Sequence, residues 1–406
     1  MFLRHACTIV LLWMCLFVCD KHGALADTEQ VVYRQVHRQK GIHGEAQEGV
    51  CKTVFEQREG FYTNVLWAEQ PVCRQGRNDT GRLLVAAPHI NAHLIRLQKQ
   101  SLDLFLQEPY DYIVYDDAYA QAHFSNWNTA DISAHIKKVT EDVGGVYRRV
   151  PQGFHDDRRC LFPSTVEPYA NNANTRCSDA YQFILRDEDV YCSSGTVIFM
   201  DADVFLISPY APTTMLRATN LSIASVPLRK TYSTVAFSLN VTQLWTAINV
   251  MDMRALPGKQ DLNWDCGGLW LFEGTPSARR FSIDSGGHTM DWLGQHNPRV
   301  RWWDVTMVAA STEDDWKWFA QKWFDIFKVH GLWDLEFKPQ ILGDIFLHLR
   351  NAGNWMKSGV RYKNIQPKQH ALIAEFLKKR KEEFDGGDIP YYPADTTRRR
   401  LRRNGR

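Results

Sequence analysis

Short apolar runs alternate with stretches of helical spacing through the first half of the chain. Leu83–Ala87 is an apolar run closed by Pro88, and Asp111–Tyr115 is a second run rich in strand-forming residues. Between them, His93–Leu106 places its apolar residues at the three- and four-residue intervals of a helix. A strand, a helix and a strand of these lengths predict a βαβ unit, the element of a parallel sheet.

The alternation continues toward the centre of the chain. Asn174–Leu185 favours a helix and leads into the apolar run Thr196–Met200, which ends at Asp201. We therefore expect an α/β protein with an open sheet, flanked by helices, whose ligands bind at the carboxyl ends of the strands. A further helical stretch begins at Gln366 and passes into a polar tail.

The N-terminus carries a separate signal. Arg4 and His5 precede an apolar stretch from Ala6 to Cys19, and a small-residue cleavage site follows at Ala26. This pattern predicts a secretory signal peptide at residues 1–26. A short signal anchor, which would hold the protein at a membrane, is the alternative, although the stretch falls short of the roughly 20 apolar residues that cross a bilayer. Both interpretations place the body of the protein in the lumen of the Golgi or ER, or outside the cell.

Composition divides the remainder into three parts. Residues 27–80 are polar and weakly patterned, which predicts a stem. Residues 81–365 hold the predicted strands, and residues 366–406 form a C-terminal helix and a basic tail expected to be disordered. The segment Trp264–Trp355 holds ten of the fourteen tryptophans. Most should be core, since large aromatic residues dominate burial, and a few would suffice for stacking on sugar rings.

Charge and cysteine content fit a secreted globular protein. The formal net charge is +2, and it turns negative without the six arginines after residue 397, which excludes a nucleic-acid binder. Six cysteines lie outside the leader, an even number that favours disulfides in an oxidising compartment. Cys51–Cys73 and Cys160–Cys177 are the local pairings to test first. The sequons at Asn78, Asn220 and Asn240 agree with the same compartment.

Two aspartates, Asp201 and Asp203, stand between the apolar run Thr196–Met200 and a second apolar run. In an extended segment residues i and i+2 point the same way, so we expect both carboxylates to face one ligand. Carboxylate oxygens suit Mg²⁺ and Mn²⁺. The other D-x-D pair, Asp187 and Asp189, has no strand leading into it, and we discount it.

Other polar residues follow predicted strands or sit on the predicted helix. His348 comes after an apolar segment and is either a third metal ligand or a satisfied core histidine. Asp116 and Asp117 end the second strand, where they would contact a ribose or form an Asx turn. Arg176 is either a donor to phosphate or an ordinary surface residue.

These motifs carry a resemblance. The run Val197–Leu206 resembles the metal-binding motif of nucleotide-sugar glycosyltransferases with the GT-A fold. The segment His348–Trp355 resembles the C-terminal His-x-x-x-x-Gly element of the glycogenin-like enzymes, with Asn354-Trp355 in place of their Lys-Pro-Trp ending. The helix before the acidic pair is similar to the one that packs over the sugar donor in many such enzymes, through Asn174, Arg176, Ala180 and Gln182.

The resemblance covers about residues 83–356 and implies both a fold and an activity. It implies a GT-A open mixed sheet with a tryptophan-rich acceptor side, and metal-dependent transfer of a sugar, most often from a UDP-sugar, to a glycan or glycoprotein. Asp201, Asp203 and His348 would hold Mn²⁺ or Mg²⁺. The donor would be contacted by Asp116, Asp117, Arg176, Gln182, Asp201 and Gly353.

Two acidic sites compete to face the acceptor. Asp265 precedes two glycines that allow close approach of a sugar, and it would bind donor hydroxyls or act on the acceptor. Glu313–Asp315 is similar to the stretch that carries the base of inverting galactosyltransferases, but it also fits the first turn of a helix, which we prefer. The glycogenin-like ending indicates that the anomeric configuration of the sugar is retained, whereas Glu313–Asp315 would indicate that it is inverted. The stereochemical outcome therefore stays open.

Two other classes of function compete with the enzyme. One is a non-catalytic carbohydrate-binding protein that keeps the fold, and the other is a disulfide-stabilised secreted interaction protein whose acidic pairs are incidental. A dehydrogenase is disfavoured, because no G-x-G-x-x-G follows the first strand.

Overall fold

The structure is a computed structural model that describes part of the chain. It covers Cys73 and residues 82–118, 129–151, 173–234, 237–264, 268–271, 279–282, 285–307, 339–349 and 360–386. The predicted leader at 1–26, the stem apart from Cys73, and the basic tail therefore lie outside the described residues.

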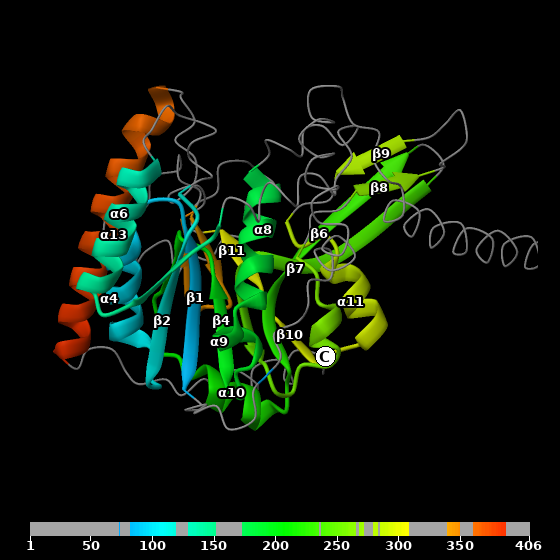
Figure 1. The fold of residues 1–406 in the computed structure, drawn as a ribbon, viewed down its shortest axis with the longest axis horizontal. Helices are drawn as coiled ribbons and strands as arrows, with labels where there is room; N and C mark the ends of the chain where they lie inside the picture. The colour runs from blue at the N-terminus through cyan, green and yellow to red at the C-terminus, as the bar shows by residue number, and fades with distance from the viewer. Residues whose placement is uncertain are drawn as a thin grey trace, which may run out of the picture.

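A seven-stranded mixed sheet forms the centre of the fold, with the strand order β10-β6-β7-β4-β1-β2-β3 (Figure 1). The pairs β3–β2, β2–β1, β1–β4 and β6–β10 are parallel, whereas β7 runs antiparallel to both β4 and β6. The predicted α/β class and open sheet are confirmed. The strands are β1 (Leu83–His89), β2 (Tyr110–Asp116), β3 (Val146–Arg149), β4 (Thr196–Met200), β6 (Ile223–Thr234), β7 (Phe237–Asp252) and β10 (Val300–Trp302).

A second, antiparallel sheet has the order β11-β12-β13-β5. Its strands are β11 (Val305–Met307), β12 (Gln340–Leu342), β13 (Phe346–His348) and β5 (Val204–Leu206). The chain thus leaves the large sheet at the end of β4 and enters the small sheet only a few residues later. A two-stranded ribbon, β8 (Gly268–Leu271) with β9 (Arg279–Ser282), completes the described strands.

Helices cover both faces of the large sheet because side chains alternate along its strands. Val85 and Ala87 of β1 join the core cluster under α4, α6 and α13, whereas Ala86 joins the cluster under α8, α9 and α11. Figure 1 shows α4, α6 and α13 gathered on one side. The helices are α4 (Ile95–Phe105), α6 (Thr129–Asp142), α8 (Ala173–Arg186), α9 (Glu188–Tyr191), α10 (Pro212–Thr219), α11 (Thr289–His296) and α13 (Val360–Asp385), with a 3₁₀ turn η3 (Lys259–Asp261).

The sequence patterns identified which helices and strands are present more accurately than they identified where these elements begin and end. The predicted helix at 93–106 corresponds to α4 and the predicted strands to β1, β2 and β4. The C-terminal helix was predicted from Gln366, but α13 begins at Val360 and continues through Pro367. Trp264, Trp292 and Trp303 are buried, as expected of core aromatic residues. None of the described helices is long and apolar enough to span a bilayer.

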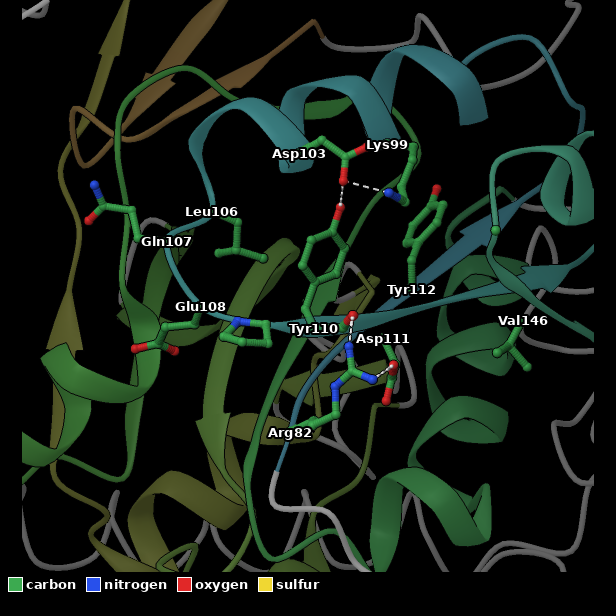
Figure 2. Close-up of a pocket in the computed structure, with 12 residues that line it drawn as sticks. Arg82, Lys99, Asp103, Leu106, Gln107, Glu108, Tyr110, Asp111, Tyr112 and Val146 are labelled. Carbon is green, nitrogen blue, oxygen red and sulfur yellow. Dashed lines mark hydrogen bonds and ion pairs between the residues drawn. The ribbon is translucent and has the colours of Figure 1, made fainter.

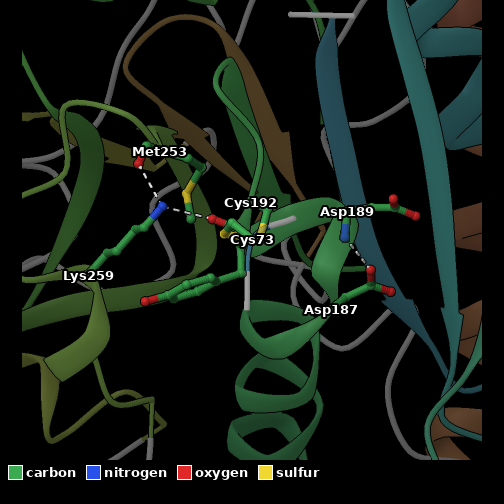
Figure 3. The surroundings of a disulfide bond; sticks show 7 residues. Cys73, Asp187, Asp189, Cys192, Met253 and Lys259 are labelled. Atoms are coloured by element: carbon green, nitrogen blue, oxygen red, sulfur yellow. Dashed lines mark hydrogen bonds between the residues drawn. A yellow bond between two sulfur atoms is a disulfide. The ribbon is translucent and has the colours of Figure 1, made fainter. Parts of the chain in front are cut away.

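A disulfide joins Cys73 to Cys192, across a sequence separation of 119 residues (Figure 3). The predicted Cys51–Cys73 pairing is therefore wrong. The fold places Cys192, which follows α9, next to Cys73, and nearness along the chain did not decide the partner. The other predicted pairing involves Cys160, which lies outside the described residues.

Candidate functional site

The carboxyl ends of β1, β2 and β4 meet at one edge of the large sheet. β1 pairs in parallel with β2, where His89 lies opposite Asp116, and with β4, where Ala86 lies opposite Phe199. The chain runs from β1 outward to β2 and β3, and then returns to β4 on the other side of β1. This reversal is a topological switch point, the place where open α/β sheets bind their ligands.

Asp201 and Asp203 lie at this edge, in a turn rather than in an extended segment. The N–H of Val204 donates to the carbonyl oxygen of Asp201 at 3.2 Å, and the N–H of Ala202 donates to Asp201 Oδ1 at 2.8 Å. The prediction that both carboxylates face the same way was therefore wrong. The physical reason is that the chain must turn here to pass from β4 in one sheet to β5 in the other.

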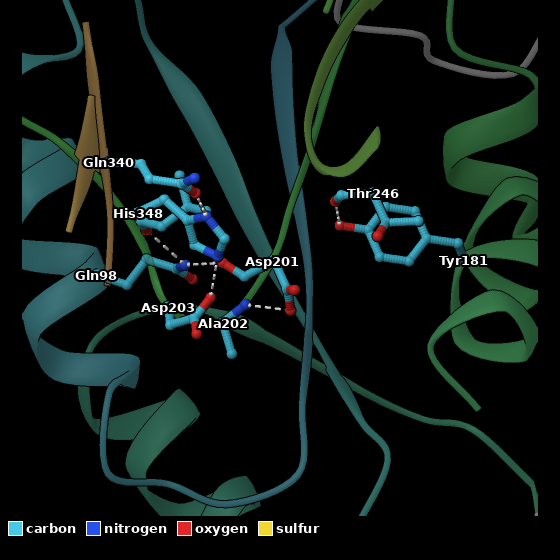
Figure 4. Close-up of polar contacts among 9 residues, drawn as sticks. Gln98, Tyr181, Asp201, Ala202, Asp203, Thr246, Gln340 and His348 are labelled. Atoms are coloured by element: carbon cyan, nitrogen blue, oxygen red, sulfur yellow. Dashed lines mark hydrogen bonds and ion pairs between the residues drawn. The ribbon is translucent and has the colours of Figure 1, made fainter. Parts of the chain in front are cut away.

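His348 lies against Asp203, although the two residues are far apart in the sequence. The strand β13 pairs antiparallel with β5 and sets His348 opposite Val204. His348 Nε2 lies 3.3 Å from Asp203 Oδ1, and His348 Nδ1 lies 3.2 Å from Gln340 Oε1 (Figure 4). The ring of Trp245 meets the imidazole edge-on, with 5.0 Å between ring centroids.

In the Asp203–His348 pair, two atoms that can both accept a hydrogen bond face each other. The oxygen of Gln340 is an acceptor, so His348 Nδ1 is the donor in that contact. In a neutral ring, Nε2 then carries a lone pair, and it faces a carboxylate oxygen that also only accepts. A protonated ring, which forms an ordinary ion pair with Asp203, satisfies this contact, and so does a cation between the two atoms. Both side chains are buried, with 6% of His348 and 1% of Asp203 exposed, so water screens the pair poorly.

The two aspartates also act on each other. Burial, followed by the negative charge of Asp203, raises the pKa of Asp201 to about 7, while His348 and the N–H of Ala202 lower it. A carboxylate beside the buried carboxylate of Asp203 is costly unless one of them takes up a proton or both bind a cation. The turn therefore has an affinity for positive charge.

A buried polar network holds the turn from behind, and the sequence analysis missed it. The side-chain amide of Gln98, on α4, donates to the carbonyl oxygens of Asp201 and Val204 at 2.9 and 3.0 Å. Its own oxygen accepts from Tyr112 Oη at 2.7 Å and lies 3.0 Å from His89 Nε2. Burial lowers the pKa of His89 to about 4, so this ring is neutral. The sequence offered one indication of this network: Gln98 is a polar residue on the apolar face of the predicted helix at 93–106.

Asp116 and Asp117 lie at the same edge, at the end of β2. Asp116 Oδ1 accepts from the N–H of Ala118 at 2.8 Å, and Oδ2 accepts from Tyr147 Oη at 2.6 Å. These contacts match the Asx-turn alternative. Asp117 is also buried, and its N–H donates to the carbonyl oxygen of His89.

Helix α8 contributes two of the predicted donor-binding residues. Arg176, in its first turn, is 2% exposed and is therefore not the surface residue that was the alternative. Gln182 Oε1 accepts from the N–H of Trp264 at 2.8 Å, so it holds the segment just before Asp265. The neighbouring Tyr181 donates its hydroxyl to the carbonyl oxygen of Thr246 on β7.

Several predicted residues cannot be placed. Asp265, Gly353 and Glu313–Asp315 lie outside the described residues. The discounted pair can be placed: the side chain of Asp187 accepts from the N–H of Asp189 and caps α9, and Arg148 Nη2 lies 2.9 Å from Asp189 Oδ2. That pair has a structural role in the described part of the chain.

The donor set at the turn suits a hard divalent cation, but its atoms do not converge. Within the described ranges, no three His, Cys, Asp or Glu side chains are grouped so that they could hold a metal ion. Asp203 and His348 face each other, whereas the carboxylate of Asp201 turns toward the N–H of Ala202 (Figure 4). Asp201 would have to leave that N–H to join the other two.

A cavity of about 730 Å³ lies at the opposite edge of the sheet (Figure 2). Arg82 precedes β1 and Tyr110 begins β2, so the cavity is at the amino ends of these strands. Four of its charged groups pair with each other: Arg82 with Asp111 at 3.1 Å, and Lys99 with Asp103 at 2.5 Å. The fifth, Glu108, accepts from Thr213 and Thr214. It therefore adds nothing to the site at the carboxyl edge.

No model of a known protein family matches the sequence, and no curated protein is significantly similar to it.

Proposed function

We propose that this protein is a glycosyltransferase of GT-A type that uses a nucleotide sugar, with a UDP-sugar as the first candidate, and a divalent cation. Its acceptor would be a glycan or glycoprotein of the secretory pathway. The proposal is supported by the position of the acidic turn at the carboxyl edge of the sheet, directly after β4.

The observation that carries the proposal is the contact between Asp203 and His348. Their facing atoms lie 3.3 Å apart, and either a proton on the imidazole or a bound cation satisfies the contact. Gln340 accepts from the other ring nitrogen, which is the arrangement that fixes the tautomer and orientation of a metal-binding histidine. Carboxylate oxygens are ligands that Mn²⁺ and Mg²⁺ accept. Asp201 would have to leave the N–H of Ala202 to complete a ligand set with Asp203 and His348.

Asp203 and His348 would hold the cation, and Asp201 would join them or contact the ribose. When bound, the cation would neutralise charge on the departing diphosphate. Arg176 would offset phosphate charge, Asp117 would face the nucleoside, and Asp265 and Gly353 would contact the sugar and the diphosphate. Asp116 would reach the ribose only by giving up its bonds to Ala118 and Tyr147.

The experiment is a thermal-unfolding series on the secreted full chain, followed by a turnover assay. Because a ligand that binds only the folded state raises its unfolding temperature, UDP together with Mn²⁺ should raise it by more than either alone. UDP-sugars should then release free UDP slowly in the absence of an acceptor. A shift without any release would indicate a non-catalytic binder. The absence of a shift with any nucleoside diphosphate and metal would contradict the proposal.

A further inference from the structure

The strand β7 contains a bulge where it passes the end of β4. Between its pairings with Ser225 and Pro227, β7 advances by five residues while β6 advances by two. Over the same stretch β7 stays paired with β4, where Ile248 lies opposite Met200. We call the segment Trp245–Ile248 the β7 bulge. Bulges redirect side chains and are over-represented next to active sites.

The backbone of the β7 bulge is held by its own set of hydrogen bonds. Three carbonyl oxygens in a row each accept one: that of Trp245 from the side-chain amide of Asn249 at 2.8 Å, that of Thr246 from the hydroxyl of Tyr181, and that of Ala247 from the N–H of Asp201 at 3.0 Å (Figure 4). Backbone groups that leave the regular ladder need such partners. The bulge is therefore a fixed feature of the fold, and its last contact joins it to the turn that carries the acidic pair.

The bulge turns Trp245 toward His348. Side chains alternate along a regular strand, which would place Trp245 on the same face as Met251. Met251 belongs to the core cluster under α8, α9 and α11, whereas Trp245 packs against the cluster on the other face of the sheet. The consecutive residues Ala247 and Ile248 both belong to that second cluster, which marks the interruption of the alternation. Trp245 consequently reaches the imidazole of His348.

Trp245 is half-buried, and its indole ring keeps a surface for a further partner. The planes of the indole and the imidazole of His348 meet at 74°, so this contact leaves at least one face of the indole unused. An indole has one N–H donor and no acceptor, so it offers no lone pair to a cation. What it offers is a flat apolar face, which matches the C–H side of a sugar ring or the plane of a nucleobase.

We propose that Trp245 contacts the ligand directly, as the surface on which the sugar ring of a nucleotide sugar stacks. This inference rests on the proposed function. Along the carboxyl edge the strands follow the order β2, β1, β4, β7. Asp117, just after β2, would face the nucleoside, and the turn after β4 would face the diphosphate. Trp245 on β7 is next in this order, where the donor continues beyond its diphosphate into the sugar.

The test compares the affinity of the full chain for UDP with its affinity for UDP-glucose, UDP-galactose and UDP-N-acetylglucosamine, by calorimetry in the presence of Mn²⁺. Trp245→Leu keeps an apolar side chain and removes the flat ring. The affinity for the UDP-sugar that the parent binds most tightly should fall at least about fivefold in this variant. The affinity for UDP, which has no sugar, should stay at the parent value.

Trp302→Leu is the matched control. Trp302 is also a half-buried tryptophan of the large sheet, but it lies on the edge strand β10 and packs against the cluster under α8, α9 and α11. Its replacement should change neither affinity. Trp245→Phe restores a smaller flat ring, so its affinity for the UDP-sugar should lie between those of the parent and Trp245→Leu. Equal losses in the Phe and Leu variants overturn the inference.

The remaining outcomes separate this inference from the proposed function. A parent that binds neither UDP nor any of the three UDP-sugars overturns both. A parent that binds UDP but none of the UDP-sugars, or an affinity for the UDP-sugar that Trp245→Leu leaves unchanged, overturns the inference alone. Equal falls in the affinities for UDP and the UDP-sugar also overturn it, because Trp245 then stacks on the base or supports His348. Titration with Mn²⁺ alone separates these two roles, since only the second weakens Mn²⁺ binding. Should Trp245→Leu fail to fold, Trp245→Met, which also lacks a ring, takes its place in every comparison.

Discussion

His348 Nε2 lies 3.3 Å from Asp203 Oδ1, across the junction of two sheets. Asp203 stands in the turn between β4 and β5, and His348 ends β13, which pairs with β5. The contact is therefore built by backbone pairing, and a short register shift between these strands would destroy it. This rigidity is what a site for a small cation requires.

Gln340 should matter to cation binding although it would not touch the ion. Its oxygen lies 3.2 Å from His348 Nδ1 and orients the ring. We expect Gln340→Leu to weaken Mn²⁺ binding by about 10- to 100-fold, the usual cost of removing an outer partner of a metal-binding histidine. Calorimetric titration with Mn²⁺ measures this, and an unchanged affinity would show that His348 needs no such orientation.

Stability should fall in acid because of His89. Its folded-state pKa of about 4 lies below the ordinary value of 6.5, so between these values the unfolded chain binds more protons than the folded one. The free energy of unfolding should therefore decrease as the pH falls from about 6.5 to about 4, by an amount on the order of 3 kcal/mol from this residue. Denaturant unfolding at several pH values measures the slope. His89→Gln should flatten it, and a variant with the parent's slope would refute this role.

The Cys73–Cys192 disulfide should contribute strongly to stability, because it closes a loop of more than a hundred residues. The double variant Cys73→Ser/Cys192→Ser should lose about 2–5 kcal/mol of unfolding free energy. Denaturant unfolding with and without reductant provides the control, since reduction should destabilise the parent by more than the double variant. Equal sensitivity to reductant would show that this bond does not form.

The contact between Tyr147 and Asp116 distinguishes two roles for that aspartate. Tyr147 Oη donates to Asp116 Oδ2 at 2.6 Å. If Asp116 serves the turn, Tyr147→Phe should cost about 1.5–3 kcal/mol of stability, as for hydrogen bonds to charged groups, and leave UDP affinity unchanged. Chemical unfolding measures the loss of stability, and UDP titration measures the affinity for UDP. If the variant instead lost UDP affinity and kept the stability of the parent, the alternative in which Asp116 contacts the ribose would be favoured.

The sequence predicted local elements, because periodicity and strand termini depend on short segments. The α/β class, α4 and the strand before Asp201 followed from such segments. The turn at Asp201–Asp203 was mispredicted because its shape depends on the pairing of β5 with β13, which no local pattern encodes. Gln98 was missed for the same reason: its partners on β1, β2 and the turn come together only in the fold. The partner of Cys73 likewise depends on where α9 packs.

Titration of UDP by calorimetry, with and without Mn²⁺, on the parent and on Asp203→Ala tests the account most directly. We expect the parent to bind UDP tightly only when Mn²⁺ is present, and the Asp203→Ala variant to lose this metal dependence while keeping its secretion and secondary structure. Metal-dependent binding that is equal in both proteins would contradict the assignment of Asp203, and a parent that ignores Mn²⁺ would contradict the cation site as a whole.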